Sequence, residues 1–350
     1  MTFEEARALF PVLERIAYLN AGTFGPLARP TLEAMEVELQ ISLTSGRIGQ
    51  AYFERVLALR EELRARLAEL VGVGPAQVAL TSSTTDGCNI VLAGLELGVG
   101  DEIVTTTEEH FGLLGPLHAS GARVVAVEAD PDALLAAVTP RTRLLALSHV
   151  LWTSGRIMPV RELKEQSGLP VLVDGAQSVG AIPVDAGGLD YYTVSGQKWL
   201  CGPDGAGALV VAEPDRLRIG RPGYFAQSSF AADGTFEPRE GAERFDPNWL
   251  SAASIAGLLA ALELAPGWCY ERAARQAARC RELLAPRVEL VPGEATLVSF
   301  RSPDPAATVA RLAERDVAVR EIPRTGLVRV SCGWWTSDGD LERLLEVVAA

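Results

Sequence analysis

Residues 169–180 read Leu-Pro-Val-Leu-Val-Asp-Gly-Ala-Gln-Ser-Val-Gly, and residues 195–203 read Ser-Gly-Gln-Lys-Trp-Leu-Cys-Gly-Pro. Each stretch contains or follows a short apolar run that ends in polar residues and glycine. Continuous apolar runs of this length are typical of strands buried on both faces of a parallel sheet. Open α/β sheets bind ligands at the carboxyl ends of their strands, where Asp174 and Lys198 fall. The two stretches therefore predict an α/β domain with a ligand site at one edge of its sheet.

Outward from these stretches, strand-like and helix-like segments alternate, which favours an α/β fold with a mostly parallel seven-stranded sheet. The expected strands are Val78–Thr81, Glu102–Thr106, Arg123–Val127, Leu144–Leu147, Val171–Asp174, Tyr191–Ser195 and Gly207–Val211. The expected helices are one or two over Glu33–Leu70, then Thr85–Leu95, His110–Ala119, Pro131–Ala137 and Val160–Ser167.

The chain has 350 residues, more than the roughly 250–300 at which single cores stop growing, so two domains are expected. We place a large α/β domain over residues 16–255 and a smaller α+β domain over residues 1–15 and 256–350. Gly220–Asn248, rich in Gly, Pro, Ser and aromatic residues, is expected to be a long ordered loop near a functional opening or a surface connection. Beyond it we expect helices over Ser251–Leu264, Trp268–Leu284, Ala306–Glu314 and Asp338–Val348, and strands over Glu289–Val291, Thr296–Phe300 and Leu327–Ser331.

The formal net charge of −13 makes nucleic acid and anionic membrane surfaces poor partners. Five cysteines without a C-x-x-C pair argue against a disulfide framework or a zinc site, so no metal is expected and a reducing cytoplasm fits. Met1–Phe10 is amphipathic and contains acids, unlike a signal peptide. No apolar run reaches the ~18 residues of a membrane span. These features together predict a cytoplasmic protein.

Only two of the 32 basic residues are lysines, Lys164 and Lys198. Lys198 lies between an expected buried strand and a Gly-Pro loop. Burial disfavours the ammonium form and lowers the pKa of the amine, which is what an imine-forming lysine needs. A surface lysine that reaches solvent from a loop would fit the same sequence, so neighbouring residues must decide.

Asp174 follows a buried strand, where a carboxylate can face a ligand, cap a helix or bind magnesium. Magnesium is disfavoured because no second carboxylate sits beside it. The run Thr81-Ser-Ser83-Thr84-Thr85 lies at a strand-to-helix turn, where hydroxyls and backbone amides form an anion site. Capping alone would explain only one or two of these hydroxyls. Because the chain has neither G-x-G-x-x-G nor a P-loop, a phosphate fits better than a dinucleotide or a nucleoside triphosphate.

Two further residues are candidates. His110 follows an expected strand and could stack on a planar cofactor and relay a proton, or be an ordinary polar residue. Arg329 lies inside the expected strand Leu327–Ser331, where its guanidinium needs an anion. A substrate carboxylate would satisfy its bidentate fork, and an internal salt bridge is the alternative.

Together these segments resemble the class V aminotransferase family of fold-type-I enzymes that depend on pyridoxal 5′-phosphate (PLP). That family includes cysteine desulfurases, isopenicillin N epimerases and cystine C–S lyases. The resemblance extends from Tyr18-Leu-Asn-Ala-Gly to the last expected helix. Its most specific parts are Val-Asp174-Gly-Ala-Gln177 and Ser195-Gly-Gln-Lys198.

The resemblance implies a role for each candidate. Lys198 would form the Schiff base with PLP and carry the α-proton, while Asp174 would pair with the pyridine nitrogen. The remaining expected contacts are Gln177 to the phenolic oxygen, His110 stacked on the ring, Ser83, Thr84, Thr85 and Ser195 on the phosphate, and Arg329 and Asn20 on the substrate. Lys198, His110 and Asp174 would be the catalytic residues. A homodimer with a shared active site is implied, with a contribution from within residues 223–248.

Three positions depart from the resemblance. Cysteine desulfurases usually have His before the lysine, where this chain has Gln197, and many relatives have Asn near the position of Trp152. Cysteine desulfurases also carry a nucleophilic Cys upstream of the arginine that binds the carboxylate. In this chain, Glu314–Thr325, which precedes Arg329, contains no Cys. Cys332 follows Arg329 in a strand pattern and is expected to pack. A persulfide mechanism is therefore disfavoured.

The sequence thus predicts a PLP enzyme acting on a small amino acid, with C–S bond cleavage of a cysteine- or cystine-like substrate by β-elimination as the leading hypothesis. Transamination with a 2-oxoacid and epimerisation are the alternatives. A non-catalytic PLP-fold scaffold or sensor is a further alternative, but it would need neither Lys198 nor Asp174. A dinucleotide-dependent dehydrogenase lacks its glycine fingerprint.

Overall fold

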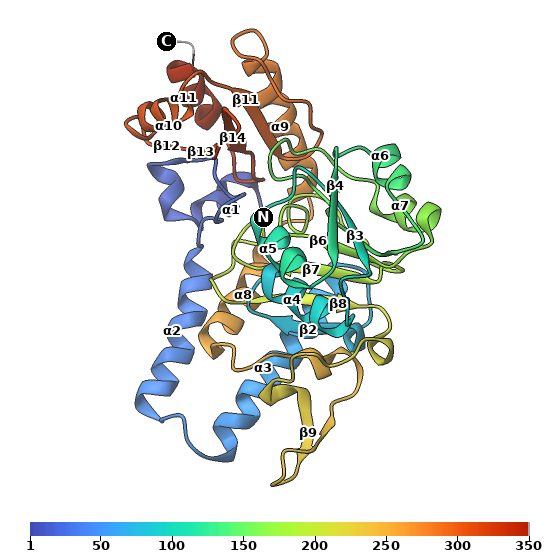
Figure 1. The fold of residues 1–350 in the computed structure, drawn as a ribbon. Coiled ribbons are helices and arrows are strands. Elements are labelled where there is room, and N and C mark those ends of the chain that lie inside the picture. Colours follow the sequence, from blue (N-terminus) through green and yellow to red (C-terminus); the bar gives the residue numbers. More distant parts are fainter. Residues whose placement is uncertain (349–350) are drawn as a thin grey trace.

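The computed structural model describes residues 1–348, and its centre is a seven-stranded sheet in the order β2-β8-β7-β6-β5-β3-β4 (Figure 1). Strand β8 runs antiparallel to both of its neighbours, and every other pairing in this sheet is parallel. The expected mostly parallel seven-stranded sheet is therefore confirmed. The strands are β2 Val78–Thr81, β3 Glu102–Thr106, β4 Arg123–Val127, β5 Thr142–Ser148, β6 Val171–Asp174, β7 Tyr191–Ser195 and β8 Gly207–Val211.

Helices cover both faces of this sheet, which explains why its central strands are continuously apolar. One face packs against α3 and α7 through side chains such as Leu63 and Leu163. The opposite face packs against α4 and α5 through side chains such as Val91 and Leu117. The helices of this part are α2 Arg29–Thr44, α3 Gly49–Leu70, α4 Thr84–Gly94, α5 Phe111–Ala119, α6 Pro131–Ala136, α7 Val160–Ser167 and α8 Ala252–Leu264.

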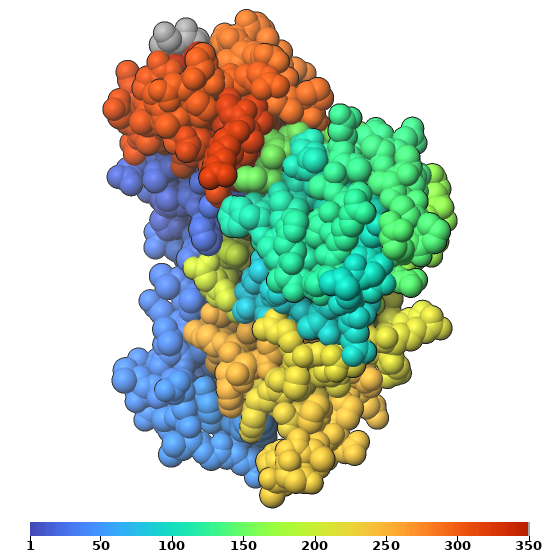
Figure 2. All heavy atoms as spheres, viewed as in Figure 1, coloured from blue at the N-terminus to red at the C-terminus, as the bar shows by residue number. Residues whose placement is uncertain are grey.

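A smaller unit lies at one end of the molecule, opposite the protruding hairpin of β9 Gln227–Phe230 and β10 Phe236–Pro238 (Figures 1 and 2). Its antiparallel sheet has the order β11-β14-β13, and strand β1 pairs with β12 in parallel beside it. The elements are α1 Phe3–Ala8, β1 Ala17–Tyr18, α9 Cys269–Leu284, β11 Leu297–Arg301, α10 Pro305–Ala313, β12 Val317–Ala318, β13 Arg320–Ile322, β14 Leu327–Ser331 and α11 Asp338–Val348.

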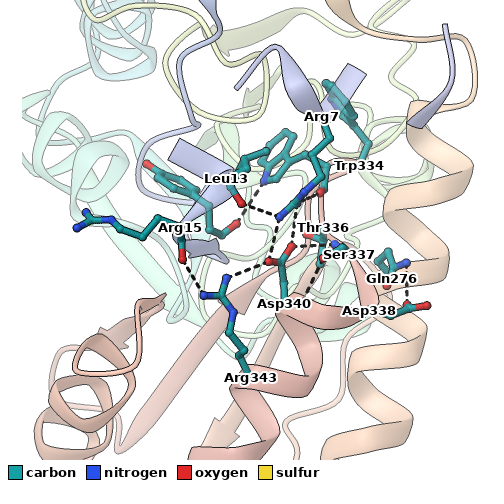
Figure 3. A network of polar contacts seen from close by, with 12 residues as sticks. Arg7, Leu13, Arg15, Gln276, Trp334, Thr336, Ser337, Asp338, Asp340 and Arg343 are labelled. Carbon is teal, nitrogen blue, oxygen red and sulfur yellow. Dashed lines mark hydrogen bonds and ion pairs between the residues drawn. The ribbon is translucent and has the colours of Figure 1, made fainter. Parts of the chain in front are cut away.

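A polar network ties the N-terminal segment to this smaller unit (Figure 3). Asp340, at the start of α11, accepts hydrogen bonds from both terminal nitrogens of Arg7 at 2.9 and 3.1 Å and from the Ser337 backbone at 2.9 Å. Arg343 adds a fourth donor at 3.3 Å. The Asp340 carboxylate is buried, so these donors replace the water that it loses.

The expected domain boundaries stay predictions, but two segments beside them make contacts with the unit to which they were not assigned. The expected boundary between residues 255 and 256 falls inside α8, whose Leu258 belongs to the core of the large sheet. Ala17–Tyr18, expected in the large domain, pairs with β12 of the small unit. The physical reason is that α8 is buried around much of its surface, so sequence periodicity gives no sign of where its core lies.

Two expected segments differ in form. Gly220–Asn248 is not a simple loop, because it holds the hairpin β9 Gln227–Phe230 and β10 Phe236–Pro238. Glu289–Val291 makes only the isolated bridge between Leu290 and Phe300 instead of a strand. Short 3-10 turns complete the chain at η1 Pro11–Glu14, η2 Pro75–Gln77, η3 Pro214–Arg216, η4 Tyr224–Ala226 and η5 Gly241–Phe245.

A buried ion cluster anchors the end of the hairpin region. Asp246 accepts from Arg60 at 2.6 Å and from Arg64 at 2.9 Å, and its other oxygen accepts from the Leu80 backbone at 2.8 Å. All three charged side chains are buried. Because an unpaired buried charge is costly, this cluster fixes the segment against α3 and β2.

Among the described helices, none is by itself long and apolar enough to cross a membrane. Of the described helices, only the pair α8 and α9 is long and apolar enough when the two are taken together, and their axes are bent by 78° relative to each other.

Candidate active site

A cleft of about 770 Å³ opens at the carboxyl ends of β5, β6 and β7, beside the small unit. It brings together nine of the ten residues that the sequence singled out. Asn20 is the tenth and does not line the cleft. The roles expected for all ten stay predictions. The nine are Ser83, Thr84, Thr85, His110, Asp174, Gln177, Ser195, Lys198 and Arg329.

Lys198 lies in the loop after β7 and is half-buried in the cleft. Burial lowers the pKa of its amine to about 8, against an opposing effect of the nearby Asp174 charge. Within residues 1–348 the amine forms no ion pair. Lys164 differs, since it pairs with Asp190 at 2.9 Å and donates to the Gly188 carbonyl at 2.7 Å. Of the two lysines, only Lys198 is therefore placed and tuned for imine chemistry.

Close backbone contacts hold the Lys198 loop in place. The Gly25 amide donates to the Gln197 carbonyl at 2.8 Å. A Cβ at position 25 would lie 2.1 Å from the Lys198 carbonyl oxygen, so only glycine fits there. Three residues after Lys198, Cys201 has φ +56°. This is a left-handed backbone conformation that costs energy for a non-glycine residue. The loop is thus fixed on both sides of the lysine.

Asp174 ends β6 and is buried beneath the cleft. Its Oδ1 accepts from the Ala176 amide at 2.9 Å and from the Thr193 hydroxyl at 3.4 Å. Desolvation raises the pKa of this carboxyl, while the Lys198 charge lowers it. Its Oδ2 accepts no hydrogen bond from the described residues, and it is the atom free to meet a cationic N–H of a ligand. No group of three metal-ligating side chains surrounds it within residues 1–348.

A second buried carboxyl, Glu109, lies nearby and was not identified from the sequence. Its Oε2 accepts from the Ser148 amide at 3.0 Å and the Ser148 hydroxyl at 2.5 Å, and its Oε1 accepts from Thr106 at 2.8 Å. Ser148 is paired with Asp174 across β5 and β6. Desolvation raises the pKa of Glu109 to about 7, and the Asp174 charge adds to this effect. The residue fixes the segment leading to His110.

The hydroxyl-rich turn forms the amino end of α4, an eleven-residue helix. Ser83 is its N-cap and accepts from the Asp86 amide at 3.1 Å. Thr84 and Thr85 line the cleft at the first helical positions. Their amides and hydroxyls suit a phosphate through the helix dipole and direct hydrogen bonds. Across the cleft, Ser195 donates its hydroxyl to Gln197 at 2.7 Å.

His110 begins α5 as its N-cap, with Nδ1 accepting from the Gly112 amide at 3.0 Å. Burial lowers the pKa of its imidazole to about 4, helped by the charges of Lys198, Arg320 and Arg329. The ring is therefore neutral at neutral pH, and the capping bond places its proton on Nε2. Its edge contacts Trp152, with ring centroids 4.8 Å apart.

Gln177 links the part of the cleft around Asp174 to the N-terminal segment. Its Nε2 donates to the Gly22 carbonyl at 2.8 Å, and its Oε1 accepts from Trp199 Nε1 at 2.9 Å. One amide hydrogen remains available for a ligand oxygen, because an NH₂ group carries two. The contact expected between Gln177 and the phenolic oxygen of PLP stays a prediction.

Arg329 is fully buried on β14 and forms no ion pair within residues 1–348, so the internal salt bridge considered from the sequence is absent there. It donates to the Trp152 carbonyl at 3.0 Å and to the Thr23 hydroxyl at 3.3 Å. Burial and the Arg320 charge lower its pKa to about 9. A buried guanidinium with these partners needs an anion from outside the chain.

Several residues of the cleft were given no role from the sequence, and most of them come from loops or very short strands. Arg320 lies on β13, which is only three residues long and is defined by its pairing with β14. The alternation Val317-Ala-Val-Arg320 is its only local signal. The others that line the cleft are Gly22, Thr23, Phe24, Phe111, Ala176, Trp152 and Gln197.

None of the five cysteines lines the cleft in the described part of the chain. Cys332 is fully buried in the core of the small unit, packed among residues such as Val330 and Leu341. The environment of this thiol agrees with the packing role expected from the sequence and leaves no nucleophilic sulfur beside Lys198.

Comparisons with known proteins give a consistent family. The model of the family described as aminotransferase class-V matches residues 18–322. The isopenicillin N epimerase of Streptomyces clavuligerus is 30% identical, with 99% of this chain and 98% of that protein covered. The solved complex of the cystine C–S lyase C-DES with cysteine persulfide has a TM-score of 0.91 at 30% identity, covering 97% and 99% of the two chains. A mutant of C-DES with glycine covalently linked to its PLP cofactor has a TM-score of 0.92 at 30% identity, covering 98% of each chain.

Proposed function

The chain belongs to the aminotransferase class-V family, and on that premise we propose that it is a C–S lyase that cleaves a cystine-like amino acid by β-elimination. The family resemblance and the fold-type-I architecture expected from the sequence are confirmed. The chain is accordingly a PLP-dependent enzyme related to cystine C–S lyase, cysteine desulfurases and isopenicillin N epimerase.

The cleft has a group for each part of PLP. The amino end of α4 with Thr84 and Thr85 would hold the phosphate, Asp174 the pyridine nitrogen, and Lys198 the aldehyde carbon. The unpaired Oδ2 of Asp174 and the unpaired Lys198 amine both fit this assignment. When bound, PLP supplies an electron sink for negative charge developing at the substrate α-carbon.

The residues of the chain would divide the work as follows. Arg329 binds the α-carboxylate and orients the substrate. The Lys198 Nζ, with a pKa of about 8, takes the proton from the α-carbon at near-neutral pH. Breaking the bond from the β-carbon to sulfur then releases a persulfide or thiol. The neutral His110 imidazole holds its proton on Nε2, where it can donate to the departing sulfur.

The observation that most favours a cystine-like substrate is a pair of arginines. Arg320 and Arg329 both line the cleft, and neither forms an ion pair within residues 1–348. Two adjacent guanidiniums without carboxylate partners in the described part of the chain suit a substrate that carries two carboxylates, as cystine does. The absence of a cysteine from the described cleft argues for elimination without a persulfide on the enzyme.

The proposal is tested by incubating the purified holoenzyme with cystine or cysteine in the absence of any 2-oxoacid. A lyase should convert cystine and water to pyruvate, ammonia and cysteine persulfide in equal amounts, and it should prefer cystine over cysteine. Coupled assays for pyruvate and for persulfide sulfur measure this. Turnover only with an added 2-oxoacid would instead identify an aminotransferase.

Epimerisation is the second candidate, because the epimerase relative aligns over 99% of the chain at 30% identity. It shares the first step, removal of the α-proton by Lys198. Chiral chromatography of the recovered amino acid separates the two candidates, since epimerisation inverts the α-carbon without releasing pyruvate.

We also propose that the enzyme is a homodimer whose cleft is shared between copies. Leu43, near the end of α2, is 79% exposed, and Ile48, which precedes α3, is 77% exposed. Trp249 lines the same surface hollow as Leu43. Phe111, at the cleft, is 66% exposed. The exposed apolar side chains around Leu43 and Trp249 are the surface that a second copy would cover. Light scattering should give twice the mass of the chain, and a fully active monomer would contradict the proposal.

A further inference from the structure

The Thr23 hydroxyl lies between the two arginines of the cleft. Its oxygen accepts from Arg320 Nη1 at 3.2 Å and from Arg329 Nη2 at 3.3 Å, and it donates to Asn20 Oδ1 at 2.8 Å. A hydroxyl has one hydrogen and two lone pairs. All of its hydrogen-bonding capacity is therefore used within the protein, and none remains for a ligand.

The two guanidiniums that it joins would otherwise repel each other. Arg320 and Arg329 are directly opposite on the antiparallel strands β13 and β14, so both side chains lie on one face of the sheet. Like charges placed opposite each other are destabilising. A shared neutral acceptor offsets this repulsion and holds the two guanidiniums close together at the cleft that both residues line.

Thr23 is itself held firmly by the loop that precedes α2. The Thr23 amide donates to the Asn20 carbonyl at 2.9 Å. The neighbouring Gly22 donates to the Ser331 hydroxyl at 3.2 Å and accepts from Gln177 at 2.8 Å. The hydroxyl therefore has a fixed position relative to both β14 and Gln177.

We propose that Thr23 is a positioning residue that sets the separation of Arg320 and Arg329 and so selects a substrate with two carboxylates. This inference rests on the proposed function, which supplies the cystine-like substrate. It also assigns Asn20 a role different from the expected substrate contact, because Asn20 acts by orienting the Thr23 hydroxyl. In this role neither residue donates a hydrogen bond to the substrate, because the Thr23 hydroxyl donates to Asn20.

Three substitutions follow from this geometry. Thr23→Val keeps the shape of the side chain and removes the acceptor shared by the two guanidiniums. Thr23→Ser keeps the hydroxyl and should preserve its function. Thr308→Val is the matched control, because Thr308 is a buried threonine of α10 that bonds to Ser302 away from the cleft.

The test uses two non-reactive ligands that lack an amino group. Dithiodipropionate has two carboxylates spaced by a disulfide, and methyldithiopropionate has one. Titration calorimetry of each holoenzyme variant gives the dissociation constants. Thr23→Val should weaken dithiodipropionate binding about tenfold or more, and methyldithiopropionate binding less than about threefold, because hydrogen bonds to charged groups are the stronger class. Thr23→Ser and Thr308→Val should stay within about threefold of the wild type for both ligands.

Equal weakening of both ligands by Thr23→Val, or no weakening of either, would overturn the proposal. Circular dichroism melting of each variant identifies a folding defect. If Thr23→Val is misfolded, Thr23→Ala, which also lacks the hydroxyl, decides by the same ratio of dissociation constants. Because these ligands bind without reacting, the result is separate from the reaction type. An aminotransferase with an altered ligand ratio would reject the lyase proposal and keep the role of Thr23.

Discussion

Replacing Lys198 with alanine should abolish covalent attachment of the cofactor and lower kcat by about 10³-fold or more, because the variant loses both the imine-forming amine and the base at the α-carbon. Intact mass after borohydride reduction should show one PLP adduct per wild-type chain and none in the variant. The pyruvate assay measures the loss of activity.

Lys164→Ala is the control for this experiment. Lys164 is the only other lysine and pairs with Asp190 on the surface, so its loss should leave the adduct and kcat unchanged. A reducible adduct and full activity in Lys198→Ala would refute the assignment of the cofactor lysine.

The pKa of Lys198 predicts how the rate of PLP uptake depends on pH. Its pKa is lowered by burial to about 8, and only the neutral amine is nucleophilic. The rate at which the apo-protein takes up PLP should therefore rise as the pH increases from 6 towards 8 and level off above it. Stopped-flow absorbance of the bound cofactor measures this rate.

Replacing Asp174 with asparagine should lower kcat on the order of 10²–10³-fold, the usual cost of losing one preorganised electrostatic group in an active site. The substitution keeps the size of the side chain and removes the charge that would stabilise the protonated pyridine ring. It also removes the charge that opposes the lowering of the Lys198 pKa. The pH at which PLP uptake is half-maximal should then move below about 8.

Asp190→Asn is the matched control, because Asp190 lies at the opposite end of the β6–β7 pair and contacts Lys164 and the Val171 amide. Its kcat and its PLP uptake profile should match those of the wild type. An Asp174→Asn enzyme with unchanged kcat would show that this carboxylate is not the partner of the pyridine nitrogen.

The central strands could be predicted from the sequence because the fold buries both of their faces. Residues 171–173 form an uninterrupted apolar run, and residues 191–194 form one that only Thr193 interrupts. The structure has the predicted bounds, Val171–Asp174 and Tyr191–Ser195. The positions of Asp174 and Lys198 at one sheet edge follow from the parallel direction of these strands. The local sequence was therefore sufficient to predict these two strands.

Arg320 and Thr23 could not be predicted in the same way. Strand β13 has three residues and exists only through its pairing with β14. Thr23 lies in a loop about 300 residues away from both arginines in sequence, and no local pattern marks that contact. Likewise, Glu109 reads as one of two adjacent acids until the fold buries it beside Ser148.

From the sequence by itself we could predict the family and the architecture, both of which are confirmed. It also singled out Lys198 and Asp174, whose roles stay predictions, because these features depend on residue types at short spacings in and beside buried strands. Only the tertiary structure showed that, among residues 1–348, Lys198 forms no ion pair while Lys164 does, and that no carboxylate of this part of the chain pairs with Arg329. It also showed that Thr23 joins Arg329 to Arg320. The physical reason is that pairing, burial and charge repulsion depend on distances between segments that the chain brings together only when it folds.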